Sequence, residues 1–383
     1  MVEQDRCHDI NAWEQRKGAE VICVRRDTIA NPPKDIVDVE LENLIEGGGL
    51  QGDLSLRTAS TSVFHEHDTL FGRLRPYLRK FWFANTSGVK SGEIWSLYSS
   101  TLKPEFLYAL TQSAQFLNQA LQTAGTKMPR AEWKTIVEAY FAVPQAEEQE
   151  KIGILFQKLE QLIDAEKRKL DLLQKKKTAL LRQIFGQKLR FKGYDNPWEP
   201  RRLGEIVTVV GGGTPDTNNP LYWNGDINWF TPAEIGSNAY ASKSERRITE
   251  EGLEHSSAKL LPAGRTVLFT SRASIGLTAI LMVEACTNQG FQSLVVSDRT
   301  DVFFLFGLCN RIKKQAIRNA AGSTFIEISG KQLAKIPLQI PSLDEQRRIG
   351  KVVRTMDSLI AVATRKIDLL TLKKKALLHQ MFV

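Results

Sequence analysis

Apolar residues recur at steps of three and four along two stretches of the chain, residues 144–186 and 341–383. This spacing places them on one face of an α-helix. Each stretch begins at a proline, and the only glycines inside the predicted helices, Gly153 and Gly350, lie in the first turns. The pattern predicts two long amphipathic helices. The first, over residues 147–185, spans roughly 58 Å at 1.5 Å per residue.

The two predicted helices are copies of one sequence. Residues 144–185 align with residues 341–382 without a gap, and 19 of the 42 positions are identical. Two matched apolar faces bury each other most simply as a coiled-coil pair, although packing on two separate domains remains an alternative. A repeat of this length indicates pseudo-two-fold symmetry, which suits a target in two parts.

The segments before the two helices, residues 1–143 and 198–340, have mixed character. Short runs rich in β-formers alternate with Gly, Pro and Asn loops. The repeat continues into these segments, since Ser96-Leu97 matches Ser293-Leu294 and Gly125-Thr126 matches Gly322-Ser323, whereas the loops between the matches differ. We therefore expect an α+β protein with two copies of one α/β domain that carry different loops, joined by a polar connector over residues 187–197.

Composition narrows the class of protein. The chain has 383 residues, 42% of them hydrophobic and 25% charged, which suits two or more globular domains. It has neither an apolar run of membrane-spanning length nor a signal-peptide pattern, so we expect a cytoplasmic protein. The four cysteines are far apart, which gives no basis for a zinc site or a disulfide framework. His65-Glu66-His67 is interpreted as a polar loop, because a third metal ligand is missing.

The net charge of +9 is concentrated in the repeated helices. Residues 150–185 carry a net charge of +4 and residues 347–383 carry +7, so the remainder of the chain carries −2. Solvated helix faces explain this charge, and so does attraction to nucleic acid or to an acidic partner. Charge alone favours the first explanation. The lysine clusters 175–177 and 373–375 are candidates for docking either partners or DNA.

Catalytic and cofactor motifs are weak in this sequence. Asn31-Pro32-Pro33 is similar to the start of an adenine methyltransferase motif, but Lys34 stands where such sites place an aromatic residue. No glycine loop for a methyl donor precedes it, and no GxxxxGK[ST] loop for ATP occurs. We therefore expect no catalytic residue, no metal and no cofactor bound by this chain.

Several segments together resemble the specificity (S) subunit of a type I restriction–modification enzyme, over essentially the whole chain. They are Trp198-Glu199-Pro200-Arg201-Arg202-Leu203-Gly204-Glu205-Ile206, Gly211-Gly212-Gly213-Thr214-Pro215, Asn288-Gln289-Gly290-Phe291, Leu70-Phe71-Gly72-Arg73-Leu74-Arg75 and the two Pro-x-x-x-Glu-Gln helix openings. Residues 1–12 contain no counterpart of Leu203-Gly204-Glu205-Ile206. We therefore expect the first domain either to begin differently or to be shortened.

The resemblance implies two target recognition domains, residues 1–143 and 198–340, in a pseudo-two-fold arrangement. Each would read one half of a bipartite asymmetric DNA site. The helices of residues 144–186 and 341–383 would form an antiparallel coiled-coil spacer and a surface for self-association. Two modification subunits would carry S-adenosylmethionine, and restriction subunits would carry ATP and Mg²⁺. The chain itself would be a non-catalytic specificity subunit.

Base reading requires planar donors and acceptors on loops that enter the major groove. Arg272 is the first candidate, because arginine pairs with guanine through two hydrogen bonds. The full set of candidate DNA-binding residues is Arg73, Arg75, Lys80, Lys90, Gly212, Thr214, Asn218, Asn219, Thr270, Ser271, Arg272, Asn288 and Gln289. Many such residues contact only phosphate or nothing, and Asn288 is equally suited to capping a turn. Trp133, Trp223 and Trp229 are interpreted as core or interface anchors.

Two other functions are compatible with the same sequence. In one, the helices are an interaction scaffold that joins two protein-binding domains. In the other, the chain is a catalytic DNA enzyme, which the missing cofactor motifs make the least favoured reading. The near-neutral recognition segments further predict that the isolated chain binds DNA weakly, because nonspecific affinity depends on the number of phosphate charges neutralised.

Overall fold

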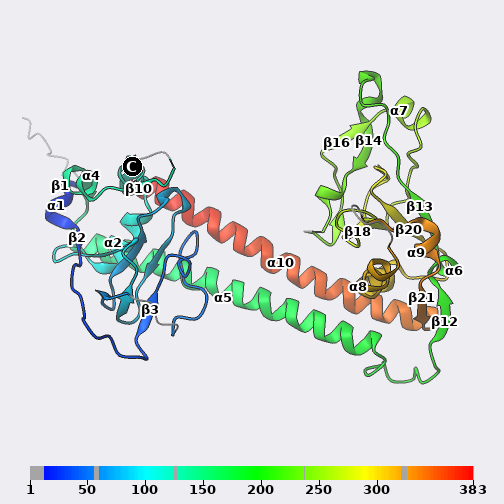
Figure 1. Cartoon of the computed structure of the whole chain (residues 1–383), viewed down its shortest axis with the longest axis horizontal. Coiled ribbons are helices and arrows are strands. Elements are labelled where there is room, and N and C mark those ends of the chain that lie inside the picture. The colour runs from blue at the N-terminus through cyan, green and yellow to red at the C-terminus, as the bar shows by residue number, and fades with distance from the viewer. Residues whose placement is uncertain (1–12, 56–59, 125–126, 237, 321–325, 383) are drawn as a thin grey trace, which may run out of the picture. The chain divides into compact units, whose positions relative to one another are not determined.

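The computed structural model describes residues 13–55, 60–124, 127–236, 238–320 and 326–382 (Figure 1). The chain divides into unit 1, residues 1–168 with 365–383, and unit 2, residues 169–364. Helix α5 (Ala146–Phe185) and helix α10 (Leu343–Met381) each contribute residues to both units. Among the described parts of the chain, no helix is long and apolar enough to cross a membrane.

Unit 1 contains two small sheets with the strand orders β2-β8-β5-β6 and β3-β7-β4, and the two-stranded pairs β1-β11 and β9-β10. The strands are β1 (Glu14–Lys17), β2 (Cys23–Val24), β3 (Val37–Val39), β4 (Ser62–Phe64), β5 (Thr69–Gly72), β6 (Phe81–Phe83), β7 (Gly88–Lys90), β8 (Ile94–Tyr98), β9 (Thr123–Ala124), β10 (Arg130–Ala131) and β11 (Tyr140–Val143). The helices before α5 are α1 (Gly18–Val21), η1 (Pro76–Leu78), α2 (Pro104–Gln112), α3 (Ala114–Ala120) and α4 (Trp133–Glu138).

The main core of unit 1 lies between these sheets, helices α2 and α3, and the ends of the two long helices. It includes Phe71, Phe106 and Phe116 from the domain, Phe156 from α5, and Phe382 just after α10. The Phe382 ring centre lies 5.5 Å from that of Trp13, 5.6 Å from that of Phe106 and 6.3 Å from that of Phe156. The end of α10 is therefore part of the core of unit 1.

Unit 2 repeats this plan with larger sheets, in the orders β13-β20-β17-β18-β15 and β16-β14-β19, and with the pair β12-β21. The strands are β12 (Glu199–Arg202), β13 (Val207–Gly211), β14 (Trp223–Phe230), β15 (Tyr240–Ala241), β16 (Arg246–Ile248), β17 (Thr266–Phe269), β18 (Thr278–Leu281), β19 (Ala285–Thr287), β20 (Gln292–Val296) and β21 (Pro337–Ile340). The helices are α6 (Leu203–Ile206), η2 (Pro220–Tyr222), η3 (Pro232–Glu234), α7 (Glu250–Glu254), α8 (Val302–Asn319) and α9 (Gly330–Ala334).

Helix α8 packs on strands β17 and β18, and its buried face joins the core of unit 2. Phe185, the last residue of α5, lies in the same core, with its ring centre 5.7 Å from that of Phe304 and 6.3 Å from that of Trp198. Trp229 and Trp223 are 3% and 8% exposed, and Trp133 is half-buried in unit 1, as expected for packing residues. The predicted α+β class is confirmed.

The structure corrects our expectation about the start of the first domain. Residues 1–12 lie outside the described residues, but strand β1 and helix α1 follow directly, and β1 pairs with β11 as β12 pairs with β21. The sequence from Trp13 to Val21 matches the sequence from Trp198 to Ile206 in the tryptophan, both glutamates and an arginine. This match has an offset of 185 instead of 197, because the loops of unit 1 are shorter in total. Gly125-Thr126 and Gly322-Ser323 also lie outside the described residues.

The two long helices pair in each unit and run antiparallel. In unit 1, the Lys374 and Lys366 ammonium groups donate hydrogen bonds to Glu160 and Glu166 respectively. In unit 2, the Lys177 ammonium donates to Asp357, a carboxylate whose side chain is 5% exposed. Lys177 and Lys374 occupy the same position of the repeat, as do Glu160 and Asp357. One lysine of each predicted cluster therefore joins the two helices and is unavailable to an external partner.

Candidate nucleic-acid interface

Three loops of unit 2 meet where strands β13, β17 and β19 end. The Gly213 N–H donates to the Thr287 carbonyl at 2.8 Å, and the Ser271 N–H donates to the Gly290 carbonyl at 2.8 Å. Thr270 also forms a β-bridge with Phe291. These contacts bring the predicted residues Gly212, Thr214, Arg272, Asn288 and Gln289 together beside the ends of these strands, which belong to the two larger sheets of unit 2.

A glycine is required at position 212, in the junction where these three loops meet, because the neighbouring backbone leaves no room for a side chain. A Cβ atom there would lie 1.9 Å from the Asn288 carbonyl oxygen and 2.5 Å from that of Thr287. Its N–H donates to the Phe291 carbonyl at 3.4 Å. The backbone group is thus used within the protein, so Gly212 positions the neighbouring loop instead of presenting its N–H to a phosphate.

Two polar side chains of the junction are joined across the loops. The Thr214 hydroxyl donates to the side-chain carbonyl of Gln289, and Gln289 is exposed. Arg272 is half-buried and lies next to Gly290, where a Cβ atom would be 3.5 Å from the Arg272 Nε. The Asn288 side chain accepts a hydrogen bond from the Gly290 N–H at 2.8 Å. Asn288 therefore caps a turn, which is the other role that its sequence allows. Arg272 and Gln289 therefore remain the better candidates for external contact.

Three other predicted residues of unit 2 have internal roles, and a fourth, Asn218, is exposed but uses its backbone N–H within the protein. Thr270 and Ser271 are both 0% exposed, so they cannot reach a base without unfolding. The Asn219 side chain accepts from the Leu221 N–H at 3.1 Å and caps η2. The Asn218 N–H donates to the Asp216 carboxylate at 2.9 Å, which places a negative charge where a phosphate was expected. The sequence shows the polarity of these residues but not their burial.

In unit 1, some of the predicted basic residues are buried or bonded within the protein, and others are exposed. Lys90 is 5% exposed within β7, so it is not a surface contact. The Lys80 ammonium donates to the Leu41 carbonyl at 2.9 Å. The Arg73 guanidinium is half-buried, with its carbon 5.8 Å from the Trp95 ring centre. Of the four, Arg75 remains exposed, and the structure adds Arg79, which sequence reasoning missed although it ends the same proline-containing loop.

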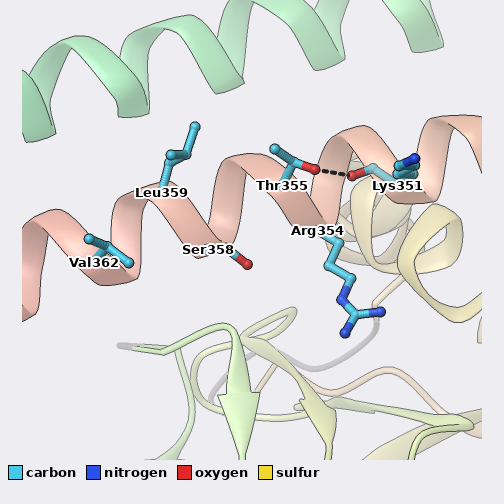
Figure 2. A pocket seen from close by; sticks show the side chains of 6 residues that line it. All are labelled: Lys351, Arg354, Thr355, Ser358, Leu359 and Val362. Carbon is cyan, nitrogen blue, oxygen red and sulfur yellow. Dashed lines mark hydrogen bonds between the residues drawn. The ribbon is translucent and has the colours of Figure 1, made fainter.

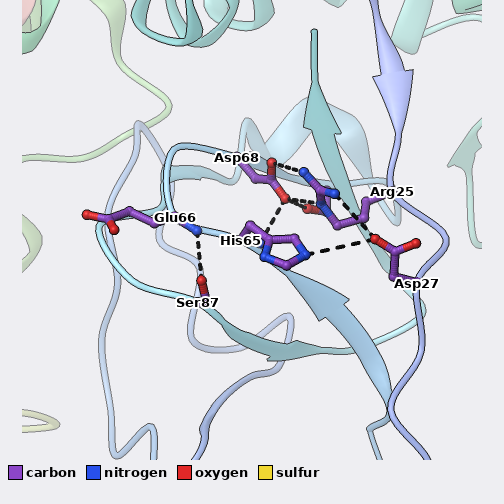
Figure 3. Close-up of polar contacts among 7 residues, drawn as sticks. Arg25, Asp27, His65, Glu66, Asp68 and Ser87 are labelled. Carbon is purple, nitrogen blue, oxygen red and sulfur yellow. Dashed lines mark hydrogen bonds and ion pairs between the residues drawn. The ribbon is translucent and has the colours of Figure 1, made fainter. Parts of the chain in front are cut away.

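A buried carboxylate organises the neighbouring strands (Figure 3). Asp68 is 2% exposed and accepts from Arg25 Nε at 2.6 Å and Nη2 at 2.9 Å, from the Ser96 hydroxyl at 2.7 Å, and from the His65 N–H at 2.9 Å. The hydrogen bond to Asp68 raises the pKa of Arg25. His65 Nε2 lies 3.9 Å from Asp27. These contacts tie β2, β5 and β8 together and are structural in character.

Burial lowers the pKa of Lys90 to about 8, although Asp68 partly opposes the shift. Since the unfolded chain then binds this proton more tightly, the free energy of unfolding rises as the pH increases from about 8 to 10.5. The expected rise is about 3 kcal/mol, from about 1.4 kcal/mol per pKa unit. Lys90→Met should remove it, as measured by urea unfolding between pH 7 and pH 10. Parallel pH profiles for the two proteins would contradict this explanation, and Lys34→Met, at an exposed position, is the control.

No catalytic arrangement is evident in the described part of the chain. A shallow groove on α10 is lined by Lys351, Arg354, Thr355, Ser358, Leu359 and Val362 (Figure 2). These residues include no carboxylate, histidine or cysteine to act as a general base, and the Thr355 hydroxyl donates to the Lys351 carbonyl at 2.8 Å. Across the described ranges, no three His, Cys, Asp or Glu residues are grouped to hold a metal ion.

Part of the chain is similar to a known protein family. Residues 195–372 match the family model of the type I restriction modification DNA specificity domain. These residues of the chain therefore carry a domain similar to the type I restriction modification DNA specificity domain. The type I restriction enzyme MjaIX specificity subunit of Methanocaldococcus jannaschii is 36% identical over 167 residues, which are 43% of this chain and 38% of that protein. The EcoR124I/EcoR124II specificity subunit of Escherichia coli is 31% identical over 179 residues, 45% of this chain and 44% of that protein.

The matches to these two specificity subunits span less than half the length of each. The fold comparison extends further. The crystal structure of the S subunit of a type I restriction–modification system from M. genitalium superposes with a TM-score of 0.69 at 14% identity, and the match covers 100% of this chain and 99% of that one. The likeness in fold to that structure therefore extends over both units and both long helices of this chain.

Proposed function

We propose that the chain is the DNA sequence-recognition subunit of a type I restriction–modification complex. Unit 1 and unit 2 each read one half of a bipartite asymmetric DNA site, and α5 and α10 form the spacer between the half-sites. The observation that carries this proposal is the presence of two units with one scaffold and different loops. A duplicated scaffold with divergent loops suits the recognition of two unlike sequences.

The reactions belong to partner subunits in this proposal. Modification subunits with S-adenosylmethionine methylate adenine, and restriction subunits with ATP and Mg²⁺ cleave DNA. The specificity chain determines the DNA sites at which these reactions take place. This division is supported by the similarity of the chain to type I restriction enzyme specificity subunits.

The decisive experiment is methylome sequencing of cells that carry the modification subunit with and without this chain. Methylated adenines in a split motif should appear only when the chain is present. Exchange of residues 198–340 for those of another specificity-family member should change one half of the motif and leave the other intact. Methylation that is independent of the chain, or a change in both halves, would contradict the proposal.

The isolated chain should bind its site weakly, because the sequence outside the basic helix segments carries a net charge of −2. The modification subunits then complete a clamp around the duplex. Gel-shift titration of the chain alone at physiological salt tests this step. Tight and site-specific binding without the modification subunits would show that no clamp is needed.

A further inference from the structure

The loop between β5 and β6 of unit 1, residues 73–80, is strongly basic. It contains three arginines and one lysine and has no carboxylate. Its counterpart in unit 2 is the loop of residues 270–277, which follows the equivalent strand β17 and includes Arg272. The two loops therefore occupy matching positions on the two copies of the scaffold. We will call residues 73–80 the basic loop.

Two of the four charged side chains anchor the basic loop. Lys80 is held by the Leu41 carbonyl, and Arg73 lies against Trp95 with its Nε atom buried. Arg73 also contributes to lowering the pKa of the neighbouring Glu93, after the larger effect of the Arg130 hydrogen bonds. These two residues fix the base of the loop, so they are unsuited to external contact.

The other two charged side chains of the basic loop, Arg75 and Arg79, lie at the surface of unit 1. Both are exposed, and neither forms an ion pair or a side-chain hydrogen bond with the residues that the structure describes. By contrast, Arg25, Arg130 and Arg190 are each bound to a carboxylate. A pair of arginines without counter-charges is suited to an anionic partner such as DNA.

The backbone of these two arginines is unusual. The φ angle is +53° at Arg75 and +48° at Arg79, a left-handed conformation that glycine adopts at lower cost. The counterpart loop in unit 2 has two such positions as well, and it fills them with Ala273 at +59° and Gly276 at +79°. Unit 1 thus places its largest basic side chains where the backbone favours the smallest residues. Such an outlier points to a use for the side chain.

The basic loop is also held firmly in this shape. The Arg75 N–H donates to the Pro129 carbonyl at 2.8 Å, and the Arg79 carbonyl accepts from the Gly47 N–H at 3.0 Å. Within the loop, the N–H groups of Leu78 and Arg79 donate to the carbonyls of Arg75 and Pro76 at 2.9 and 3.0 Å. Both arginine side chains therefore extend from a preorganised backbone, which lowers the entropy lost on binding.

We propose that Arg75 and Arg79 are specificity-determining residues of unit 1 that read guanine in the major groove of the first half-site. This inference rests on the proposed function. A guanidinium fork pairs with guanine O6 and N7 through two hydrogen bonds, and that pairing requires a fixed orientation. A phosphate also accepts a guanidinium fork, but a lysine on an unstrained backbone serves it as a point charge without a fixed orientation. The constrained backbone therefore favours base reading.

The test uses the full chain with its modification subunit and compares three kinds of variant by methylome sequencing. Arg75→Gly and Arg79→Gly remove the side chain and suit the left-handed backbone. Each should raise the thermal midpoint of unfolding, and each should lower discrimination at one guanine of the first half-site by about 10- to 100-fold. Arg75→Lys and Arg79→Lys keep the charge and should lose discrimination to a similar extent. Arg26→Ala, at another exposed arginine of unit 1, should retain the wild-type motif.

Each result decides a separate point. If the lysine variants keep the wild-type motif, the two arginines contact phosphate and the inference is wrong. If the glycine variants keep both the motif and the level of methylation, these residues have no role in recognition. If the variants lose discrimination in the second half-site instead of the first, the basic loop reads the second half-site and its assignment to the first is wrong. If the wild-type chain itself directs no methylation to a split motif, the proposed function fails, and this inference fails with it.

Discussion

Replacing Phe382 by alanine is expected to lower the free energy of unfolding of unit 1 by about 3–5 kcal/mol, the usual range for a buried phenylalanine. Phe382 is 2% exposed and contacts the rings of Trp13, Phe106 and Phe156. Loss of the ring leaves a cavity that these rigid aromatic groups fill poorly. Urea unfolding of the full chain, combined with hydrogen exchange at amides of each unit, measures the effect.

Matched variants make this result specific. Phe185→Ala removes the corresponding ring from the core of unit 2 and should destabilise that unit instead. Leu372→Ala, within α10 but 64% exposed, should change the free energy of unfolding by less than about 0.5 kcal/mol. Equal effects of Phe382→Ala and Leu372→Ala would show that the end of α10 is not part of the core.

Gly212→Ala should destabilise unit 2 and abolish DNA recognition by its loops. The added Cβ atom would lie 1.9 Å from the Asn288 carbonyl oxygen, so the backbone on one side must move. We expect a loss of about 1–3 kcal/mol or more in the free energy of unfolding, as for other overpacked sites. Displacement of Asn288 and Gln289 should also eliminate methylation specified by the second half-site, measured in the methylome.

The neighbouring glycine supplies the control. At Gly211 the nearest atoms to an added Cβ are those of the Gln292 amide, 3.7 and 3.8 Å away, which is ordinary contact. Gly211→Ala should therefore keep the motif and should stabilise the chain slightly, because alanine reduces the freedom of the unfolded state. If Gly211→Ala and Gly212→Ala behave alike, the close approach at Gly212 is not what shapes the site.

The long helices were predictable because their information is local. Steps of three and four residues, a proline before each start and a gapless repeat placed the predicted helix of residues 147–185 within one residue of α5. The opening strand of unit 1 was missed for a different reason. Its match to Trp198 and the following residues has another offset, because insertions in the loops of unit 2 shift the alignment. A search at one fixed spacing cannot find it.

The DNA-binding role of the candidate residues stays a prediction, but the structure shows which of them are exposed. The glycine triplet, Arg272 and Gln289 do converge in unit 2. Burial, however, depends on contacts between distant segments, so Ser271 and Lys90 were taken for surface residues although they are 0% and 5% exposed. Arg79 was missed because nothing in its residue type indicates a left-handed backbone. Polarity and turn composition locate a loop, whereas the tertiary structure decides which of its side chains are free.

The position of Phe382 has a consequence for synthesis on the ribosome. Unit 2 is one continuous stretch of chain, whereas unit 1 receives its last helical segment only from residues 365–383. The part of the chain that is translated first therefore completes its core last. Between the two parts of unit 1, the ribosome adds residues 169–364, which takes roughly 10–40 s at 5–20 residues per second. During that interval, the apolar surfaces around Trp13 and Phe106 lack their contact with Phe382, which has not yet been synthesised.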